Sequence, residues 1–378
     1  MQEKINNLTG LRAYAATWVA LYHFNGTLGT SIPTFIGPVI GNGAWGVDIF
    51  FVLSGFILSH IYSRNFRENN IKFSDFKIFI VKRFARIYPM HFFTFLLTCA
   101  FLIIALKTNF QFSKDHDFGL YTALLNIFMV QAWGLEKTPS WNQVSWSISA
   151  EWFAYLFLFF SIIKLSTKIN LSKFIFCLVV VWLLLIVYSN FYLKKDISSV
   201  VTFGIARIIP EFLGGYVVYE LSNKSPNLVK LNGIIKSINC DLVAFIALIA
   251  ICGLANLPYA FNIFLLPFIM LLIGALNIGG PYSNIIFGNK TVLYFGEISY
   301  SVYLIHPFVN IVGKRFSEKI IYCRSLNWLF LVVLFEFIFL IVLASISFHL
   351  IEKPFREKIV SLFYPKSKNT IPQLAELP

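Results

Sequence analysis

The sequence predicts an all-α, polytopic membrane protein, and its composition supports this in two ways. Of the 378 residues, 57% are hydrophobic and only 13% are charged, whereas soluble globular proteins have about 25% charged residues. The mean hydropathy is +0.72, and the aromatic residues include 42 Phe and 8 Trp. This composition excludes an ordinary soluble domain.

Ten segments are long and apolar enough to cross a membrane as helices, since a span needs about 20 apolar residues. They are residues 8–28, 44–62, 88–106, 143–163, 174–193, 200–221, 240–256, 258–278, 292–312 and 328–351. The segment 119–133 is apolar but short, which predicts either an eleventh span or a short re-entrant or interfacial helix. Residues 1–357 are expected to form the transmembrane domain, and 358–378 a polar cytoplasmic tail.

The distribution of basic residues favours ten spans over eleven. If 119–133 does not cross, both termini lie on one side, and that side carries 21 of the 31 Lys and Arg residues. Lys and Arg collect in cytoplasmic loops, so both termini are predicted to be cytoplasmic, with the 119–133 helix on the outer side. The net charge of +13 is then a topology signal. Because the basic runs lack the motifs of nucleic-acid-binding modules, we expect no nucleic acid partner.

The cysteines and the N-terminal segment each support a further prediction. The five cysteines are scattered without C-x-x-C spacing, which indicates neither a disulfide framework nor a metal site. We therefore expect no metal. The apolar run behind MQEKINN is interrupted by charge and lacks a small-residue cleavage pattern, so it is predicted to be an uncleaved first span.

The first span holds two ionisable residues, Arg12 near its cytoplasmic end and His23 near its outer end. The eleven helical steps from Arg12 to His23 turn about 20° past three full turns, so both side chains share one face, about 16 Å apart along the axis. An ionisable residue inside a membrane bundle indicates a functional site. The alternative is an Arg that snorkels and a His that reaches the lipid headgroups.

Other polar residues lie at the same two depths. Asp48 opens the second span at the depth of His23, and Glu151 lies two turns into the fourth span. On the cytoplasmic side, Arg83 and Arg86 are three residues apart and therefore neighbours on a helix. Such a fork suits a phosphate, although an anionic-lipid anchor is the alternative for this basic cluster.

Two further polar features are expected to be structural. Arg207 and Glu211 are four residues apart in the sixth span, which predicts a mutual ion pair. Ser54 lies in LSGF and lacks the G-x-S-x-G spacing of a nucleophile elbow. A small residue at a helix crossing is the expected role of Ser54.

Six motifs follow one another in an order that resembles the membrane-bound acyltransferase 3 family, which O-acylates cell-surface sugars. They are Arg12 with His23, FFVLSGF, the Arg83–Arg86 fork, SWSISAEWFAY, SYSVYLIHPF and IEKPFR. Each is weak alone, but together they cover residues 8–357. The resemblance implies about ten helices with both ends cytoplasmic, in agreement with the charge count. Many members carry a further esterase-like domain, and this chain is expected to be a stand-alone form.

The resemblance also implies a chemistry. The donor would be acetyl-CoA, and the acceptor a sugar hydroxyl of a surface polysaccharide such as O-antigen, or of its lipid-linked oligosaccharide precursor. The phosphates of the acyl-CoA would lie on Arg12, Arg83 and Arg86, with the thioester beside His23. His23 is the expected general base, because neutral imidazole suits proton transfer near pH 7. An acyl-His23 intermediate is the open alternative.

Further residues are expected around the base. Asp48 or Glu151 would orient it, as the acid of a catalytic triad does. His306, near the outer end of the ninth span, and Trp141 and Trp146 are candidates for sugar contacts. Aromatic residues of a membrane-interface belt are an equally good interpretation of the two tryptophans.

Two other classes of function compete with acyl transfer. One is a transporter or flippase of a lipid-linked sugar that uses His23 and buried carboxylates as a proton relay. The other is a structural or sensor membrane protein whose buried charges only pair. Transporters often consist of two related halves with broken helices, and the sequence shows no such symmetry. The expected location is the inner membrane of a bacterium, in contact with membrane lipid, and a homo-oligomer is left open.

Overall fold

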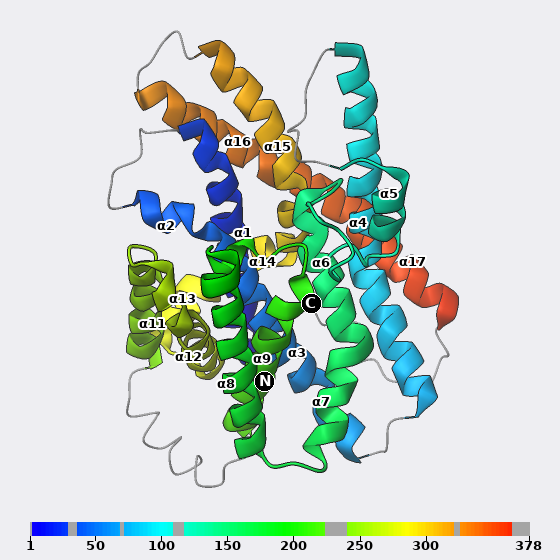
Figure 1. Ribbon diagram of the computed structural model, residues 1–378, viewed down its shortest axis with the longest axis vertical. Helices are drawn as coiled ribbons and strands as arrows, with labels where there is room; N and C mark the ends of the chain where they lie inside the picture. Colours follow the sequence, from blue (N-terminus) through cyan, green and yellow to red (C-terminus); the bar gives the residue numbers. More distant parts are fainter. Residues whose placement is uncertain are drawn as a thin grey trace.

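Helices make up the fold seen in the computed structural model (Figure 1). The structure describes residues 2–28, 36–68, 72–108, 117–223, 240–320 and 326–364. Within these ranges no β-strand forms, and two isolated β-bridges join Asp117 to Ser140 and Trp133 to Phe203. The predicted all-α class is therefore confirmed for the described residues.

The helices follow one another closely along the chain. The α-helices are α1 (Gln2–Leu28), α2 (Gly37–Gly41), α3 (Gly46–Glu68), α4 (Phe73–Thr108), α5 (Leu120–Ile127), α6 (Trp146–Phe153), α7 (Phe159–Ser166), α8 (Leu171–Val187), α9 (Gly204–Asn223), α11 (Cys240–Leu254), α12 (Leu265–Ile278), α13 (Pro281–Phe287), α14 (Lys290–Glu297), α15 (Ser299–Ile320), α16 (Leu326–Ser347) and α17 (Lys353–Phe363). Short 3-10 turns are η2 (Gly43–Trp45), η3 (Gln143–Ser145), η6 (Ile197–Ser199) and η7 (Tyr259–Phe264). The π-helical turns are η4 (Ala154–Leu158), η5 (Tyr188–Leu193) and η8 (Phe348–Glu352).

Six stretches of the described chain are long and apolar enough to cross a membrane. They are Gly43–Arg67, Phe73–Lys107, Gln143–Ser166, Leu171–Leu193, Tyr259–Ile278 and Leu331–Phe363. Each overlaps one of the ten predicted spans, so the membrane character predicted from composition is supported. The count of ten and the cytoplasmic side of both termini stay predictions.

The other four predicted spans fall on helices of a different kind. The helices α1, α9 and α15 have 27, 20 and 22 residues but carry ionisable side chains along their length. In contrast, α11 is apolar but has only 15 residues. The predicted span 292–312 is also interrupted, because α14 ends at Glu297 and α15 begins at Ser299.

The short apolar segment 119–133 contains one helix, α5, of eight residues. A helix of this length rises about 12 Å, well short of the roughly 30 Å of the hydrocarbon core. After Ile127 the chain continues without regular helix as far as Asn142. Residues 119–133 therefore do not cross a membrane as a helix, which agrees with the preferred topology.

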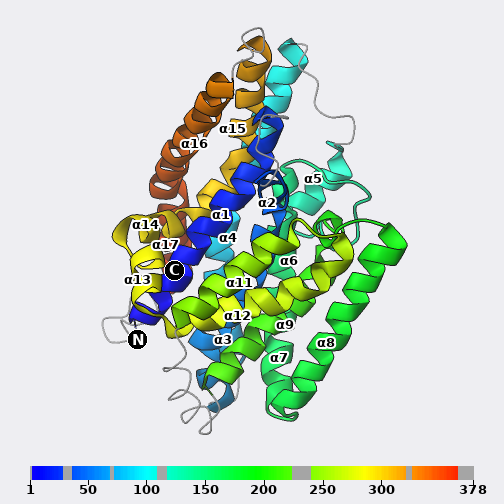
Figure 2. The same cartoon turned by 90° about the vertical axis from the view of Figure 1, so that its left-hand side faces the viewer.

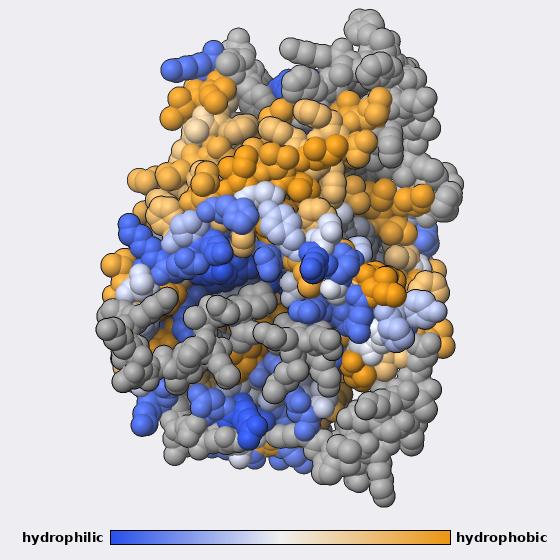
Figure 3. Space-filling view, turned by 180° about the vertical axis from the view of Figure 1, so that it is seen from behind, coloured by the Kyte–Doolittle hydropathy of each residue, from blue (hydrophilic) through white to orange (hydrophobic). Residues whose placement is uncertain are grey.

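The ends of the long helices fall into two groups. The start of α1, the end of α3 and the turn between α7 and α8 lie toward one end of the molecule, and the ends of α1, α4 and α15 toward the other (Figures 1 and 2). Figure 3 shows a broad apolar surface above a hydrophilic band. On the same side, α16 exposes Leu334, Phe335, Ile338 and Val342. An apolar outer surface of this kind suits contact with lipid.

The helices α3 and α9 cross at two glycines. A Cβ atom added to Gly55 would collide with the carbonyl oxygen of Phe212, and one added to Gly215 would collide with the carbonyl oxygen of Val52. Small residues allow two membrane helices to approach this closely. The glycines therefore set the distance between α9 and α3, and side chains of α3 line the site described below.

A buried ion pair joins the same two helices. The guanidinium of Arg207 in α9 donates to both carboxylate oxygens of Asp48 in α3, over 3.3 Å from Nε to Oδ1 and 2.7 Å from Nη2 to Oδ2. Glu211 lies 3.8 Å from Nε, and the ring centroid of Trp146 lies 4.9 Å from Cζ. The predicted pair of Arg207 with Glu211 is present, but Asp48 is the closer partner.

We predict that Gly215→Ala lowers the stability of the bundle. The added methyl group has no room between α3 and α9, and overpacking of this kind costs about 1–3 kcal/mol. The free energy of unfolding is measured in detergent micelles. The matched control is Gly253→Ala in α11, where a Cβ atom meets nothing within 4 Å. Equal unfolding free energies for the two variants would contradict the close approach.

We also predict that Asp48→Ala lowers the free energy of unfolding by about 3–5 kcal/mol, because it leaves the Arg207 charge buried without its bidentate partner. Unfolding in detergent micelles measures the loss. The double variant Asp48→Leu with Arg207→Met removes both charges and should recover most of the stability. An unchanged unfolding midpoint in Asp48→Ala would show that the ion pair does not stabilise the packing of α3 on α9.

Candidate active site

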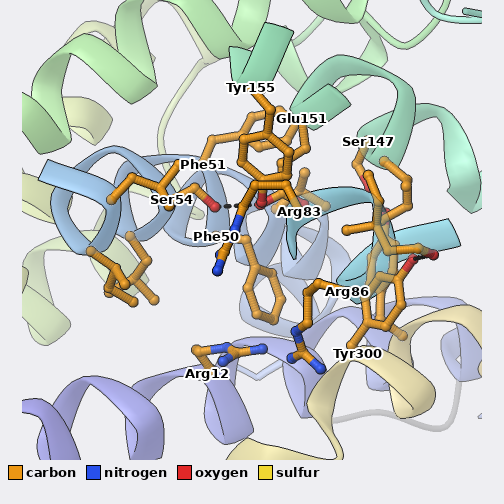
Figure 4. Close-up of a pocket in the computed structure, with 17 residues that line it drawn as sticks. Arg12, Phe50, Phe51, Ser54, Arg83, Arg86, Ser147, Glu151, Tyr155 and Tyr300 are labelled. Atoms are coloured by element: carbon orange, nitrogen blue, oxygen red, sulfur yellow. Dashed lines mark hydrogen bonds between the residues drawn. The ribbon is translucent and has the colours of Figure 1, made fainter. Parts of the chain in front are cut away.

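A partly open cavity of about 100 Å³ lies between the helices of the bundle and is lined by 17 residues (Figure 4). The lining comes from α1, α3, α4, α6, η4 and α15. Its polar members are Arg12, Ser54, Arg83, Arg86, Ser147, Glu151, Tyr155, Tyr300 and Tyr303. Leucine, isoleucine, valine and phenylalanine side chains complete the wall. An apolar pocket with a few convergent polar groups is the usual form of a small-molecule site.

Three guanidinium groups point into the cavity from two helices, Arg12 from α1 and Arg83 and Arg86 from α4 (Figure 4). Arg86 forms an ion pair with the buried Glu352 of η8, whose Oε2 also accepts from Ser301 Oγ over 2.6 Å. Within the described ranges, Arg12 and Arg83 form no ion pair, and Nε of Arg83 has no hydrogen-bond partner. The cavity therefore carries positive charge that its own carboxylates only partly neutralise.

Glu151 enters the cavity from α6, one helical turn after Ser147. Its Oε1 accepts a hydrogen bond from Ser54 Oγ of α3 (Figure 4). The π-helical turn η4 begins three residues later and brings Tyr155 into the same wall. Such π-helical turns are frequent at functional sites. Ser54, expected to be only a small residue at a helix crossing, thus also lines the cavity.

The two histidines predicted for the outer side lie together. The ring centroids of His23 in α1 and His306 in α15 are 4.7 Å apart. Neither belongs to the 17 lining residues, but Tyr303 connects them to the cavity. Tyr303 lines the wall, and its ring centroid lies 5.8 Å from that of His306. The arginines and the histidines are therefore two parts of one region inside the bundle.

The remaining predicted residues lie elsewhere. Both carboxylate oxygens of Asp48 accept from Arg207, so no contact supports its predicted role as the partner of His23. Trp146 is buried and its ring covers Arg207. This packing gives Trp146 a structural role in the bundle, and we propose no contact between Trp146 and the sugar.

Trp141 lies in the non-helical segment before η3. Its Nε1 donates to Thr122 Oγ1 over 3.3 Å, and its ring packs on Phe95 with centroids 4.6 Å apart. In the same segment Glu136 accepts from Ser140 over 2.6 and 2.8 Å, and burial raises the pKa of this carboxyl to about 7. These contacts hold the segment against α4 and α5.

Three residues that lie in or beside the cavity were not predicted as site residues from the sequence. Glu352 was noted only as part of IEKPFR, and its pairing with Arg86 joins residues 266 positions apart. Ser147 and Tyr303 lie within SWSISAEWFAY and SYSVYLIHPF but were not singled out as site residues. In the structure, Ser147 Oγ donates to the Tyr303 hydroxyl over 2.8 Å. Among the described residues, no group of three or more His, Cys, Asp or Glu side chains is arranged to hold a metal ion.

Comparisons with known proteins identify the family. The acyltransferase 3 family model, described as an acyltransferase domain, matches residues 5–349. A protein named as an O-acetyltransferase in Staphylococcus aureus (strain COL) is 26% identical over 94% of this chain and 58% of its own length. The O-acetyltransferase OatA of Staphylococcus aureus (strain MRSA252) is 26% identical over 96% of this chain and 59% of its own length.

A third relative comes from another genus. Acyltransferase MdmB of Streptomyces mycarofaciens is 30% identical over 46% of this chain and 43% of its own length. The chain spans just under three fifths of the length of the two Staphylococcus aureus relatives, and no solved structure matches it. The family match includes every residue that lines the cavity, together with both histidines beside it. The chain belongs to the acyltransferase 3 family.

Proposed function

We propose that this protein is a membrane O-acetyltransferase. It moves an acetyl group from cytoplasmic acetyl-CoA to a sugar hydroxyl of a surface polysaccharide, or of its lipid-linked precursor, on the outer side of a bacterial inner membrane. The names of its Staphylococcus aureus relatives support the reaction class. The comparisons do not favour a transporter or flippase, because the relatives above are named as acyltransferases.

One observation carries the proposal: three guanidinium groups converge on a cavity that leads, through Tyr303, to a pair of histidines. Arg12 and Arg83 are half-buried, and they form no ion pair among the described residues. An anionic ligand that enters the cavity would neutralise them. Phosphate groups accept bidentate hydrogen bonds from arginine, and coenzyme A supplies them.

The geometry of α1 supports a donor whose phosphates lie at the arginines and whose thioester lies at the histidines. Arg12 and His23 share one face of the helix, about 16 Å apart along the axis. A donor held by its phosphates at the arginines would extend its pantetheine arm along the apolar and aromatic wall. Its thioester would then reach the histidines, where water is largely excluded and the acceptor hydroxyl approaches from the opposite end of α1.

The reaction needs a base and a proton donor. Neutral His23 takes the proton of the acceptor hydroxyl while the oxygen attacks the thioester carbonyl. The tetrahedral intermediate collapses, the bond from carbonyl carbon to sulfur breaks, and the His23 imidazolium returns the proton to the departing CoA thiolate. The products are an O-acetyl ester and free CoA, and His23 is again neutral.

We predict that His23→Ala lowers acetyl transfer at least about 100-fold, because general-base catalysis contributes about 10²–10⁴-fold. Transfer is measured with purified protein, radiolabelled acetyl-CoA and surface polysaccharide from a strain that lacks the gene. The control is His349→Ala, which removes an exposed histidine. Undiminished transfer by a folded His23→Ala variant would exclude His23 as the base.

We predict that Arg12→Gln and Arg83→Gln each weaken acetyl-CoA binding about 10- to 100-fold, since a hydrogen bond to a charged group contributes about 1.5–3 kcal/mol. Equilibrium binding to protein in detergent measures the dissociation constant. Arg64→Gln serves as the control, because Arg64 is exposed and lies outside the cavity wall. If all three variants bind acetyl-CoA like the parent protein, the proposed donor site at Arg12 and Arg83 is wrong. The result would then favour the interpretation of these arginines as a lipid anchor.

A further inference from the structure

His306 is held in one tautomer by its own helix. The side chain is fully buried, and its Nδ1 lies 2.6 Å from the carbonyl oxygen of Tyr303. A carbonyl oxygen only accepts hydrogen bonds, so Nδ1 must carry the proton. In a neutral imidazole the other nitrogen, Nε2, is then an unprotonated acceptor.

Pro307 explains why the Tyr303 carbonyl is available. In a continuous α-helix this carbonyl would accept the backbone N–H of residue 307. Proline has no N–H, and Pro307 lies inside the helix α15. The His306 side chain therefore fills a position that the following proline has left open. In this helix the hydrogen bond to the Tyr303 carbonyl fixes both the ring of His306 and its tautomer.

The acceptor nitrogen of His306 lacks a hydrogen-bond donor in the part of the chain that the structure describes. Its Nε2 is buried and has no hydrogen-bond partner among the described residues. The ring of His23 lies against it, with centroids 4.7 Å apart and planes at 44°. A rotation of the His23 side chain that turns a ring N–H toward this Nε2 would allow a hydrogen bond between the two rings.

We propose that His306 is a positioning residue for His23. Its Nε2 accepts the N–H of His23, which leaves the second nitrogen of His23 unprotonated and able to take the acceptor hydroxyl proton. The inference rests on the proposed role of His23 as the base. It replaces the expected carboxylate partner, since Asp48 is bound by Arg207 and Glu151 accepts from Ser54. The same hydrogen bond stabilises the imidazolium that forms during transfer, as the acid of a triad does.

The first test compares two substitutions of similar size. His306→Gln keeps a side-chain acceptor near the position of Nε2, whereas His306→Leu keeps only the volume. We expect kcat to fall about 100-fold in His306→Leu and less than about 10-fold in His306→Gln, with KM for acetyl-CoA within about twofold of the parent in both, by analogy with losses at histidine-orienting groups. Equal kcat values for the two variants would overturn the role of the acceptor nitrogen.

The second test restores the missing backbone donor. In Pro307→Ala the N–H of residue 307 competes for the Tyr303 carbonyl, which releases Nδ1 of His306 and lets the tautomer exchange. We expect kcat to fall about 10-fold while the thermal midpoint does not fall, because alanine suits a helix interior better than proline. A purely structural role for Pro307 predicts the reverse pattern, a lower thermal midpoint with kcat lost in proportion.

The matched control is Pro210→Ala, which removes a proline from the interior of α9 instead. It should leave kcat within about twofold, and an equal loss of kcat in Pro210→Ala and Pro307→Ala would overturn the proposal. Failure of the proposed function looks different, because His23→Ala would then retain transfer. If His23→Ala is inactive while His306→Leu and Pro307→Ala match the parent, His23 stands as the base and the inference about His306 alone is wrong.

Discussion

Charge that is buried away from water must find a partner, and this constraint organises the interior of the bundle. Arg207 forms an ion pair with Asp48, and Arg86 forms an ion pair with Glu352. Both pairs join helices that are far apart in the sequence, so they also fix the packing of the bundle. Arg12 and Arg83 point into a cavity and form no ion pair within the described ranges. On the same principle we propose that the half-buried Arg12 and Arg83 bind an anionic ligand.

Two of the three π-helical turns among the described residues, and Pro307, lie beside the candidate site. The π-helical turn η4 follows Glu151, and η8 ends at Glu352. Pro307 interrupts the hydrogen bonding of α15 next to His306. In each place the regular i to i−4 pattern is broken close to a polar side chain that lines or adjoins the cavity. A break of this kind costs stability in a helix, so its repeated position beside polar residues favours a functional reason over chance.

The sequence predicted what depends on local spacing. Helical periodicity placed Arg12 and His23 on one face, and the three-residue spacing joined Arg83 to Arg86. The structure brings these arginines to one cavity and His23 to His306. Local spacing cannot predict partners that meet only when helices pack. The Asp48–Arg207 pair spans 159 positions. Sequence reasoning predicted Asp48 or Glu151 as the partner of His23, and it predicted the Arg207–Glu211 pair, which is present beside the closer Asp48.

Three helices that hydropathy describes poorly hold ionisable residues in the interior of the bundle. The helices α1, α9 and α15 do not belong to the six apolar stretches, and they hold His23, Arg207 and His306. Much of each helix is buried by its neighbours, and α9 is buried along most of its length. A helix surrounded by protein does not need an apolar surface toward lipid. Such a helix can therefore hold polar and ionisable residues. The buried helices α1 and α15 thus add Arg12 and Tyr303 to a cavity whose other walls come largely from the apolar helices α3, α4 and α6.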